Sequence, residues 1–254
     1  MDYVNEHLIF DRDELPVHEG IHWWKIDQLR LGLGRVAQEL RIEHTYAIPS
    51  KEQPGWFCFG LLQSRRILLN VDSLQVVPKL ADRPVVARVS TPVYLPPGAQ
   101  HRFWVSTTLW LSLQSMDKQL LELPAVRLSD TWFGPNQRKG ELCYAAKTHA
   151  RTAGTLATSN PYKAVTPVTI VNESKEFLVL EKINLPVVHL ALYRHDQHFW
   201  TTSVKVVRAQ TNGELKVIME AGAPPEASAA VSLQEPRQPV PEGVLFKAKD
   251  WLLG

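Results

Sequence analysis

Apolar and polar residues alternate with a period of two over most of the chain. The alternation is clearest from His101 to Ser115, where one set of positions comprises Phe103, Val105, Thr107, Leu109, Leu111 and Leu113. A period of two places such a set on one face of a β-strand. Trp104 and Trp110 fall in the other set, which indicates that the second face of this strand is partly covered as well.

The N-terminal part shows the same alternation with one change of phase. Its apolar positions are Trp24, Ile26, Leu29, Leu31 and Leu33, followed by Leu40, Ile42, His44 and Tyr46. The phase slips near Asp27, and we expect a β-bulge there, because a bulge inserts one extra residue into a strand. Residues 33–41 also fit a short helix.

The second half predicts further short strands, rich in β-branched and aromatic residues, at 165–171, 177–183, 187–193, 199–209 and 215–221. The step Thr211-Asn212-Gly213 is a hairpin signal. Besides residues 33–41, only residues 147–155 and 247–253 fit short helical turns. The sequence therefore predicts an all-β protein of two β-sandwich-like units with minor helix.

Changes in composition suggest how the chain is divided. We expect an N-terminal β-rich unit over residues 1–145 and a C-terminal β-sandwich part over residues 160–221, with the boundary in T-A-G-T-L-A-T-S-N-P. Residues 222–243 are rich in Pro and Ala, which is typical of a linker or surface strap. The apolar segment V-L-F-K-A-K-D-W-L-L-G (244–254) is predicted to dock, either on its own chain or on a neighbouring subunit.

Composition and charge exclude several classes of partner. The 254 residues are 44% hydrophobic and 21% charged, as in ordinary globular proteins, and the net charge of +2 argues against a nucleic-acid partner. No apolar run is long enough to span a bilayer, and the acidic N-terminus does not resemble a secretory signal, so we expect no direct membrane insertion. With only two cysteines, Cys58 and Cys143, a disulfide framework is not expected and a cytoplasmic location fits best.

The segment from Thr131 to Arg151 follows no structural period and gathers chemically capable side chains. We identify it as a candidate ligand-binding site made of Arg138, Glu141, Cys143, Tyr144, Lys147, His149 and Arg151. Its basic residues could frame a small anion, or one of its arginines could neutralise Glu141. Cys143 could also act as a nucleophile with His149 as its base. The alternative is an ordered connection with solvated charges and a buried Cys143; a strand there would place Glu141 and Cys143 on one face and Tyr144 on the other.

Two histidine groups have spacings that occur in metal sites. His18-Glu19-Gly20-Ile21-His22 matches H-E-x-x-H, which binds zinc when both imidazoles lie on one helical turn. Pro16 and Gly20 disfavour a helix, so a lead-in to a strand is the favoured interpretation.

The second group, His195 and His198, flanks a predicted hairpin turn and could chelate a metal together with Asp196. An exposed polar turn is the simpler interpretation. His189 should lie well along the preceding strand, away from the turn.

Three motifs together resemble an uncharacterised prokaryotic family, a domain of unknown function found in archaea and some proteobacteria. They are F-G-P-x-x-x-G-E-L-C-Y (133–144), V-N-E-S-x-E-x-L-x-L-E-K-I-x-L-P-V (171–187) and A-L-Y-x(6)-F-W-T (191–201). The resemblance covers about residues 100–210 and implies a β-rich domain without an assigned activity. It also implies that the gene lies near genes of small mechanosensitive channels, and hence a role accessory to a membrane-transport system.

The sequence favours a binding or assembly module that recognises a protein partner or associates with itself. The supporting observations are continuous strand patterning, the absence of a nucleotide-binding loop and eight tryptophans that could anchor an interface. We expect no cofactor. The alternative is a hydrolase, which would use either zinc at His18 and His22 or the Glu141, Cys143 and His149 region.

Overall fold

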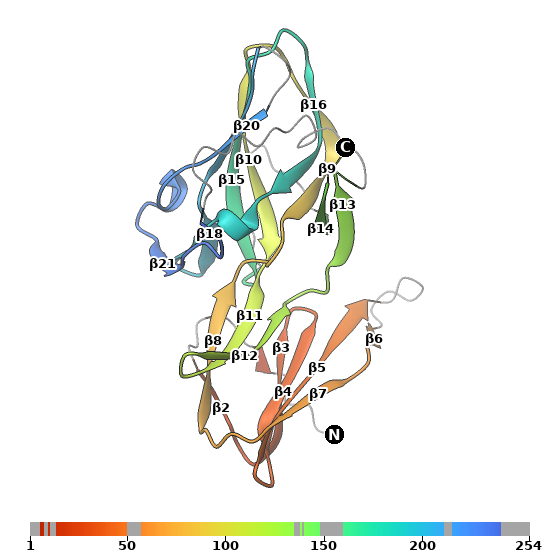
Figure 1. Ribbon diagram of the computed structural model, residues 1–254, viewed down its shortest axis with the longest axis vertical. Coiled ribbons are helices and arrows are strands. Elements are labelled where there is room, and N and C mark those ends of the chain that lie inside the picture. Colours follow the sequence, from red (N-terminus) through yellow and green to blue (C-terminus); the bar gives the residue numbers. More distant parts are fainter. Residues whose placement is uncertain are drawn as a thin grey trace. The chain divides into compact units, whose positions relative to one another are not determined.

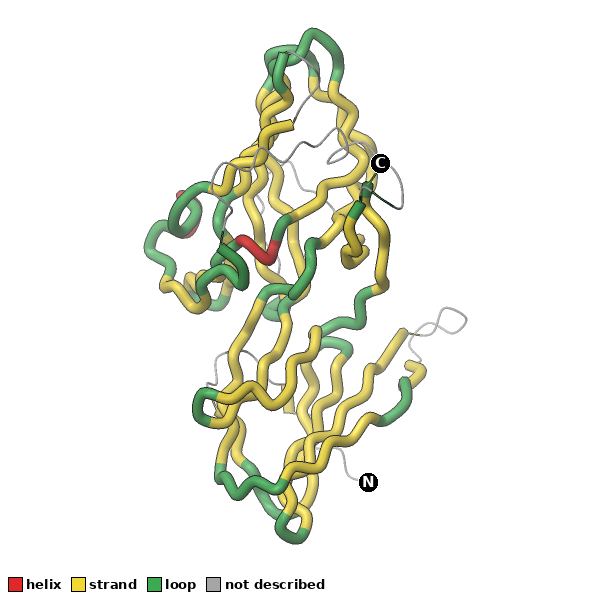
Figure 2. Tube along the Cα trace, viewed as in Figure 1, coloured by secondary structure: helices red, strands yellow, loops and turns green. Residues whose placement is uncertain are grey.

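The computed structural model describes residues 6–7, 10, 14–49, 57–134, 138, 140–147, 160–210 and 215–239. Strands make up most of this part of the chain, and its helical content is two short 3-10 turns (Figures 1 and 2). The prediction of an all-β protein with minor helix is therefore confirmed. No helix within these ranges has the length and apolar character needed to cross a membrane.

Residue contacts divide the chain into two compact units, each formed by separate stretches of sequence. Unit 1 comprises Met1–Lys79 and Thr108–Arg127, and unit 2 comprises Leu80–Thr107 and Leu128–Gly254. The boundary differs from the one expected near residues 145–162. The physical reason is that β9 (Val85–Leu95) pairs with both β14 (Glu141–Lys147) and β16 (Leu178–Leu185), so one sheet joins strands from both sides of the expected boundary.

Unit 1 contains two sheets. The first has the order β1-β3-β4-β5-β6, with β7 also paired to β5, and its strands are β1 (Glu6–His7), β3 (Gly20–Ile26), β4 (Leu29–Val36), β5 (Glu39–Pro49), β6 (Phe57–Phe59) and β7 (Gln63–Ile67). The second has the order β12-β11-β8-β2, formed by β2 (Glu14–Pro16), β8 (Ser73–Lys79), β11 (Trp110–Ser115) and β12 (Lys118–Pro124).

Two local predictions for unit 1 are wrong. The change of phase near Asp27 is a hairpin turn rather than a β-bulge, because Ile26 pairs with Leu29 and Asp27 has a φ of 52°. Residues 33–41 form the end of β4, a turn with a φ of 58° at Ala37, and the start of β5, not a helix. In both cases two strands with alternating apolar residues are joined by a tight turn. The predicted inward positions from Trp24 to Ile42 are all at most 2% exposed.

Unit 2 also contains two sheets. The larger has the order β20-β19-β15-β18-β17-β21, with β10 paired to β15, and its strands are β10 (Gln100–Thr108), β15 (Lys163–Asn172), β17 (Leu192–His195), β18 (His198–Thr201), β19 (Val204–Arg208), β20 (Leu215–Met219) and β21 (Val231–Gln234). The smaller has the order β13-β14-β9-β16, with β13 at Ser129–Phe133. Each unit thus contains two sheets.

Three predicted strands are interrupted. The strand expected from His101 to Ser115 breaks at Leu109 into β10 and β11, which pair with different sheets, although its alternating inward residues are all buried as predicted. The strand expected at 199–209 is β18 followed by β19. The one expected at 187–193 begins as the 3-10 helix η1 (Val187–His189), which includes His189, before β17 starts at Leu192.

The described part of the Pro- and Ala-rich segment is attached to unit 2. It forms the 3-10 helix η2 (Pro225–Ala227) and then β21, which pairs with β17. Glu226 accepts two hydrogen bonds from Arg102, from Nε to Oε1 at 2.7 Å and from Nη2 to Oε2 at 2.9 Å. The segment is therefore an anchored strap through Pro239; the predicted docking segment 244–254 lies outside the described residues.

A buried asparagine explains the V-N-E-S motif. Asn172 is fully buried, and its Nδ2 donates to the carbonyl oxygens of Leu95 (2.9 Å), Pro96 (3.1 Å) and Glu176 (2.8 Å). Its Oδ1 accepts from the Ser174 hydroxyl at 2.7 Å. One amide thus joins the turn after β9 to the turn after β15, and the motif is structural in this part of the chain.

Candidate functional site

The G-E-L-C-Y motif is a β-strand in a hairpin. Strand β14 starts at Glu141 and pairs antiparallel with β13, so that Phe133 lies opposite Glu141 and Trp132 lies opposite Leu142. The predicted alternation holds, because Glu141 and Cys143 share one face of β14 and Leu142 and Tyr144 share the other.

Because Gly140 has no side chain, the Trp132 indole can occupy the space beside it. A Cβ atom at position 140 would collide with Trp132 Nε1 and would lie 2.6 Å from the carbonyl oxygen of Phe133. Glycine at this position is therefore required by the close approach of a side chain and a carbonyl group, and it sets the start of β14 directly before Glu141.

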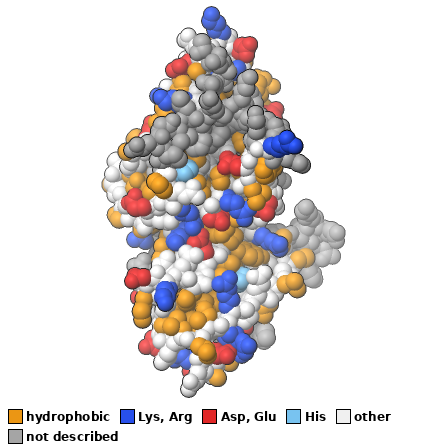
Figure 3. Space-filling view, in the orientation of Figure 1, with side chains coloured by type: hydrophobic (Ala, Val, Ile, Leu, Met, Phe, Trp, Pro, Cys, Tyr) orange, Lys and Arg blue, Asp and Glu red, His pale blue; other side chains and the backbone are white. Residues whose placement is uncertain are grey.

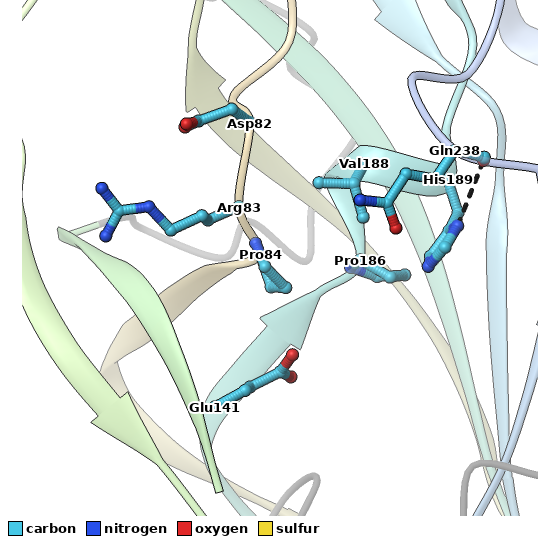
Figure 4. A pocket seen from close by; sticks show the side chains of 8 residues that line it. All are labelled: Asp82, Arg83, Pro84, Glu141, Pro186, Val188, His189 and Gln238. Carbon is cyan, nitrogen blue, oxygen red and sulfur yellow. Dashed lines mark hydrogen bonds between the residues drawn. The ribbon is translucent and has the colours of Figure 1, made fainter.

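A small hollow lies at one edge of the smaller sheet of unit 2. Strand β14 runs parallel to β9, and β16 runs antiparallel to it, so that the starts of β9 and β14 and the end of β16 meet at this edge. The hollow has a volume of about 240 Å³ and is lined by Asp82, Arg83, Pro84, Glu141, Pro186, Val188, His189 and Gln238 (Figure 4). Drug-sized ligands usually occupy roughly 300–1,000 Å³, so this hollow suits a small molecule or one side chain.

Glu141 supplies a carboxylate with a neutral partner. Figure 4 shows its side chain directed toward Pro84 and Pro186, and Asn184 Nδ2 donates a hydrogen bond of 2.8 Å to Glu141 Oε1. Asn184 itself is fully buried. Within the described part of the chain no cation pairs with Glu141.

The other two charged residues of the lining, Asp82 and Arg83, already have partners outside it. The Tyr144 hydroxyl donates to Asp82 Oδ1 at 2.9 Å, and Arg83 lies over the Tyr144 ring with its Cζ 4.5 Å from the ring centre. Arg83 also forms a 3.2 Å ion pair with Asp130. Burial, and then the hydrogen bond to Asp82, raise the pKa of Tyr144 to about 12, so the phenol stays protonated and keeps donating.

Cys143 has the properties of a core residue. Its side chain is fully buried, and burial raises the pKa of the thiol to about 12, with a further contribution from the negative charge of Glu141. A thiol with this pKa carries almost no thiolate at neutral pH. The geometry therefore favours the structural interpretation of Cys143 over the nucleophilic one.

The structure brings together only part of the predicted ligand-binding set. Glu141 lines the hollow and Tyr144 positions Asp82, whereas Arg138 is exposed and does not line the hollow. Lys147 is the last residue of β14, and its side chain is not described. His149 and Arg151 lie outside the described residues.

Sequence reasoning missed the remaining wall of the hollow. Asp82, His189 and Gln238 come from segments far apart in the sequence, and only the fold brings them to one edge. His189 Nδ1 lies 3.2 Å from the carbonyl oxygen of Gln238, which closes this side of the hollow (Figure 4). Asp82 and Arg83 stand just before Pro84 and the start of a strand, and nothing in the local sequence pattern indicates a binding site there.

The H-E-x-x-H match does not adopt the geometry of a zinc motif. His22 lies in strand β3 and Gly20 has a φ of 80°, so His18 and His22 are not on one helical turn, and their ring centres are 6.2 Å apart. The predicted lead-in to a strand is confirmed.

His195 and His198 are paired across the β17–β18 hairpin as predicted, and His195 Nδ1 lies 3.7 Å from Asp196 Oδ2. Across the described ranges, no group of three or more His, Cys, Asp or Glu side chains is arranged to hold a metal ion. Acidic and basic side chains are interspersed on the face drawn in Figure 3.

Comparison with known proteins identifies the family of the chain. No curated protein and no solved structure matches the chain. The sequence model of one family, described as protein of unknown function (DUF432), matches residues 10–251, which extends well beyond the three motifs at 133–201. The chain therefore belongs to the DUF432 family, whose function is unknown.

Proposed function

We propose that the protein is a binding module whose hollow at Glu141 takes a cationic side chain from a partner protein. The observation that supports this proposal is the Glu141 carboxylate, which lines the hollow and, among the described residues, is paired only with the neutral amide of Asn184. Such a carboxylate is a ready acceptor for an ammonium or guanidinium group.

The walls of the hollow suit the rest of a lysine or arginine side chain. Pro84, Pro186 and Val188 are apolar, and they could contact the aliphatic stem while the charged end reaches Glu141. An anionic ligand, the other possibility raised by the sequence, would be repelled by the Glu141 carboxylate. The one cation of the lining, Arg83, is already paired with Asp130.

Small analogues of these side chains test the proposal. We expect n-butylammonium and n-butylguanidinium to shift the amide NMR signals of Gly140 to Leu142 saturably but with weak affinity, because an exposed ion pair contributes only about 0–1 kcal/mol. Glu141→Gln should abolish these shifts, since it removes the charge and keeps an acceptor for Asn184. Glu181→Gln, a change at an exposed position of β16, is the matched control and should bind like the wild type. Equal shifts with neutral n-butanol would refute the proposal.

The partner and the location belong to the same proposal. The family resemblance suggests a component of a membrane-transport system as the partner, which would present a lysine or arginine to the hollow. A cytoplasmic location is supported by two unpaired cysteines, Cys58 and Cys143, which suit a reducing compartment.

A second candidate function, self-association, is favoured by an exposed apolar surface on unit 1. Half of the exposed large hydrophobic residues in the described part of the chain, six of twelve, lie between Ile48 and Leu68, and β6 is exposed at all three of its residues. Strands with exposed apolar side chains at a sheet edge commonly pair with another chain. Light scattering after gel filtration should show a dimer that Phe59→Ser with Leu61→Ser converts to a monomer. A wild-type monomer at all concentrations would contradict this candidate.

A further inference from the structure

One face of the larger sheet of unit 2 carries an aromatic cluster. Val165 of β15 pairs with Trp200 of β18, and Trp200 pairs with Tyr193 of β17, so these three side chains stand side by side on one face. Trp104 of β10 packs against them. The Pro- and Ala-rich strap lies over this cluster, and its strand β21 pairs with β17 (Figure 1). The strap is therefore the cover of an aromatic surface.

An arginine on the same face is oriented to bind a carboxylate. Arg102 lies two residues before Trp104, on the same side of β10. Its guanidinium donates to the hydroxyl groups of Thr169, at 3.2 Å, and Ser203, at 3.4 Å, and both of these residues are buried. The same guanidinium donates to the Glu226 carboxylate through Nε at 2.7 Å and Nη2 at 2.9 Å. The two hydroxyl groups thus hold the guanidinium in place for a bidentate contact with a carboxylate.

The strap follows its carboxylate with a small apolar residue. Ala227, which comes directly after Glu226, is 1% exposed and belongs to the same buried cluster as Val165 and Trp200. Ala230 packs against this cluster from the strap as well. The strap thus shows which chemistry the face accepts: an acidic side chain followed at once by a small apolar one.

The strap fits this face incompletely. The indole nitrogens of Trp104 and Trp200 are buried and have no hydrogen-bond partner among the described residues, and the same is true of Gln234 Oε1 in β21. Buried indole N–H groups usually have an acceptor. Strand β21 is short, its pairing with β17 contains a register shift, and Val231 at its start is 64% exposed. A segment held in this way can be displaced by a ligand that supplies the missing acceptors.

We propose that this face is a peptide-binding site, which the strap occupies when no partner is bound. The ligand is an extended segment of a partner protein in which a glutamate or aspartate precedes a small apolar residue. Its carboxylate binds Arg102, its small side chain enters the cluster at Trp200, and its backbone carbonyl groups accept from the indole N–H groups, as in other aromatic sites for extended peptides. The binding residues on the sheet are separate from those that line the hollow at Glu141, so each proposal can be tested without the other.

A synthetic peptide with the sequence of residues 222–232, G-A-P-P-E-A-S-A-A-V-S, tests the proposal on the full chain. Glu226→Ala removes the carboxylate that holds the strap at Arg102. We expect the peptide to bind this variant about ten-fold more tightly than the wild type, because the apparent affinity for a site rises with the fraction of molecules in which the site is free. Glu235→Ala, at an exposed glutamate of the same strap, is the matched control and should bind the peptide like the wild type.

The indole N–H signals of Trp104 and Trp200 show whether the peptide binds at this face. In an NMR titration of Glu226→Ala, with the signals assigned through Trp104→Phe and Trp200→Phe, both signals should shift saturably. A peptide with glutamine in place of its glutamate should shift neither. Shifts confined to the other tryptophans, equal shifts with the glutamine peptide, or equal affinity of Glu226→Ala and Glu235→Ala would overturn the proposal.

The strap of a second copy is the competing occupant of this face. Light scattering after gel filtration distinguishes the two cases. A wild-type dimer that persists after Phe59→Ser with Leu61→Ser but dissociates after Glu226→Ala would show that straps are exchanged between copies. That result would overturn occupation of the site by the strap of the same chain.

Discussion

The Asn184 side chain donates a 2.8 Å hydrogen bond to the Glu141 carboxylate and thereby joins the end of β16 to the start of β14. Asn184 is fully buried, and its Oδ1 has no hydrogen-bond partner in the described part of the chain. The amide is thus oriented by Glu141. A neutral donor fixes the carboxylate in place without adding a positive charge, and the proposal that the hollow accepts a cation rests on this property.

Replacement of Asn184, the neutral donor, by an acid should destabilise the protein. Asn184→Asp would place two carboxylates within hydrogen-bonding distance, and we expect the free energy of unfolding to fall by about 1–3 kcal/mol. Adding Glu141→Gln should recover most of this loss, because the new amide at position 141 can donate to the carboxylate introduced at position 184. Urea unfolding of the four proteins of this double-mutant cycle measures the coupling. Additive effects would show that the two side chains do not interact.

The contact between Gly140 and Trp132 leads to a second prediction. Gly140→Ala should destabilise the protein by about 1–3 kcal/mol, because its Cβ would collide with the indole and the Phe133 carbonyl group. Gly60→Ala is the matched control, since no atom lies closer than 3.8 Å to a Cβ built there. Urea unfolding compares the two. Equal stability of both variants would mean that the hairpin tolerates a shifted Trp132.

Cys143 should be unreactive in the folded protein and should make stability depend on alkaline pH. A thiol reagent should label Cys58, which is exposed, and reach Cys143 only after unfolding. The folded pKa of Cys143 is raised from 9.0 to about 12, so its contribution to stability is complete below pH 9 and is lost as the pH rises toward 12. Each pH unit in that window should cost up to about 1.4 kcal/mol.

Cys143→Ala should show a smaller loss of stability between pH 8 and pH 10.5 than the wild type, measured by urea unfolding at each pH. In the labelling experiment, Cys58→Ser serves as the control and should have no fast-reacting thiol. A second fast thiol in the native wild type would contradict the buried position of Cys143.

The amide network of Asn172 should be among the most sensitive points of unit 2. Asn172→Asp replaces a donor to three carbonyl oxygens by a carboxylate, and we expect a loss of about 3 kcal/mol or more. Asn160→Asp is a suitable control, because Asn160 Oδ1 accepts from the Tyr162 amide and a carboxylate can do the same. Thermal unfolding should separate the two variants clearly; similar melting temperatures would show that the network contributes little.

The sequence predicts the strands well and their grouping poorly. Alternation identifies the buried faces from Trp24 to Ile42 and from Phe103 to Leu113, since a half-buried strand needs a period of two. It does not show where strands end: a tight turn at Asp27 resembles a bulge, and the break at Leu109 does not interrupt the alternation. Pairing partners distant in the chain, such as β9 with β16, leave no local pattern, and they determine the two units.

The candidate site was predictable only in its central residue. Glu141 could be identified because it stands in an aperiodic segment between glycines and a strand. Asp82, Asn184 and His189 could not, since each lies in an ordinary strand end or turn whose neighbours across the fold are unknown from the sequence. The charged partners expected for Glu141 were its neighbours in sequence, whereas its actual partner lies forty-three residues away.

Cation binding at Glu141 can be followed most directly through the side-chain amide signal of Asn184, recorded by NMR during titration with n-butylguanidinium. Because Asn184 donates to Glu141, a cation that binds the same carboxylate should shift this signal saturably, in step with the backbone amides of Gly140 and Leu142. We expect this shift in the wild type and in Glu181→Gln, and its absence in Glu141→Gln. An Asn184 signal that does not move at saturating ligand, or that moves equally in Glu141→Gln, would contradict cation binding at this carboxylate.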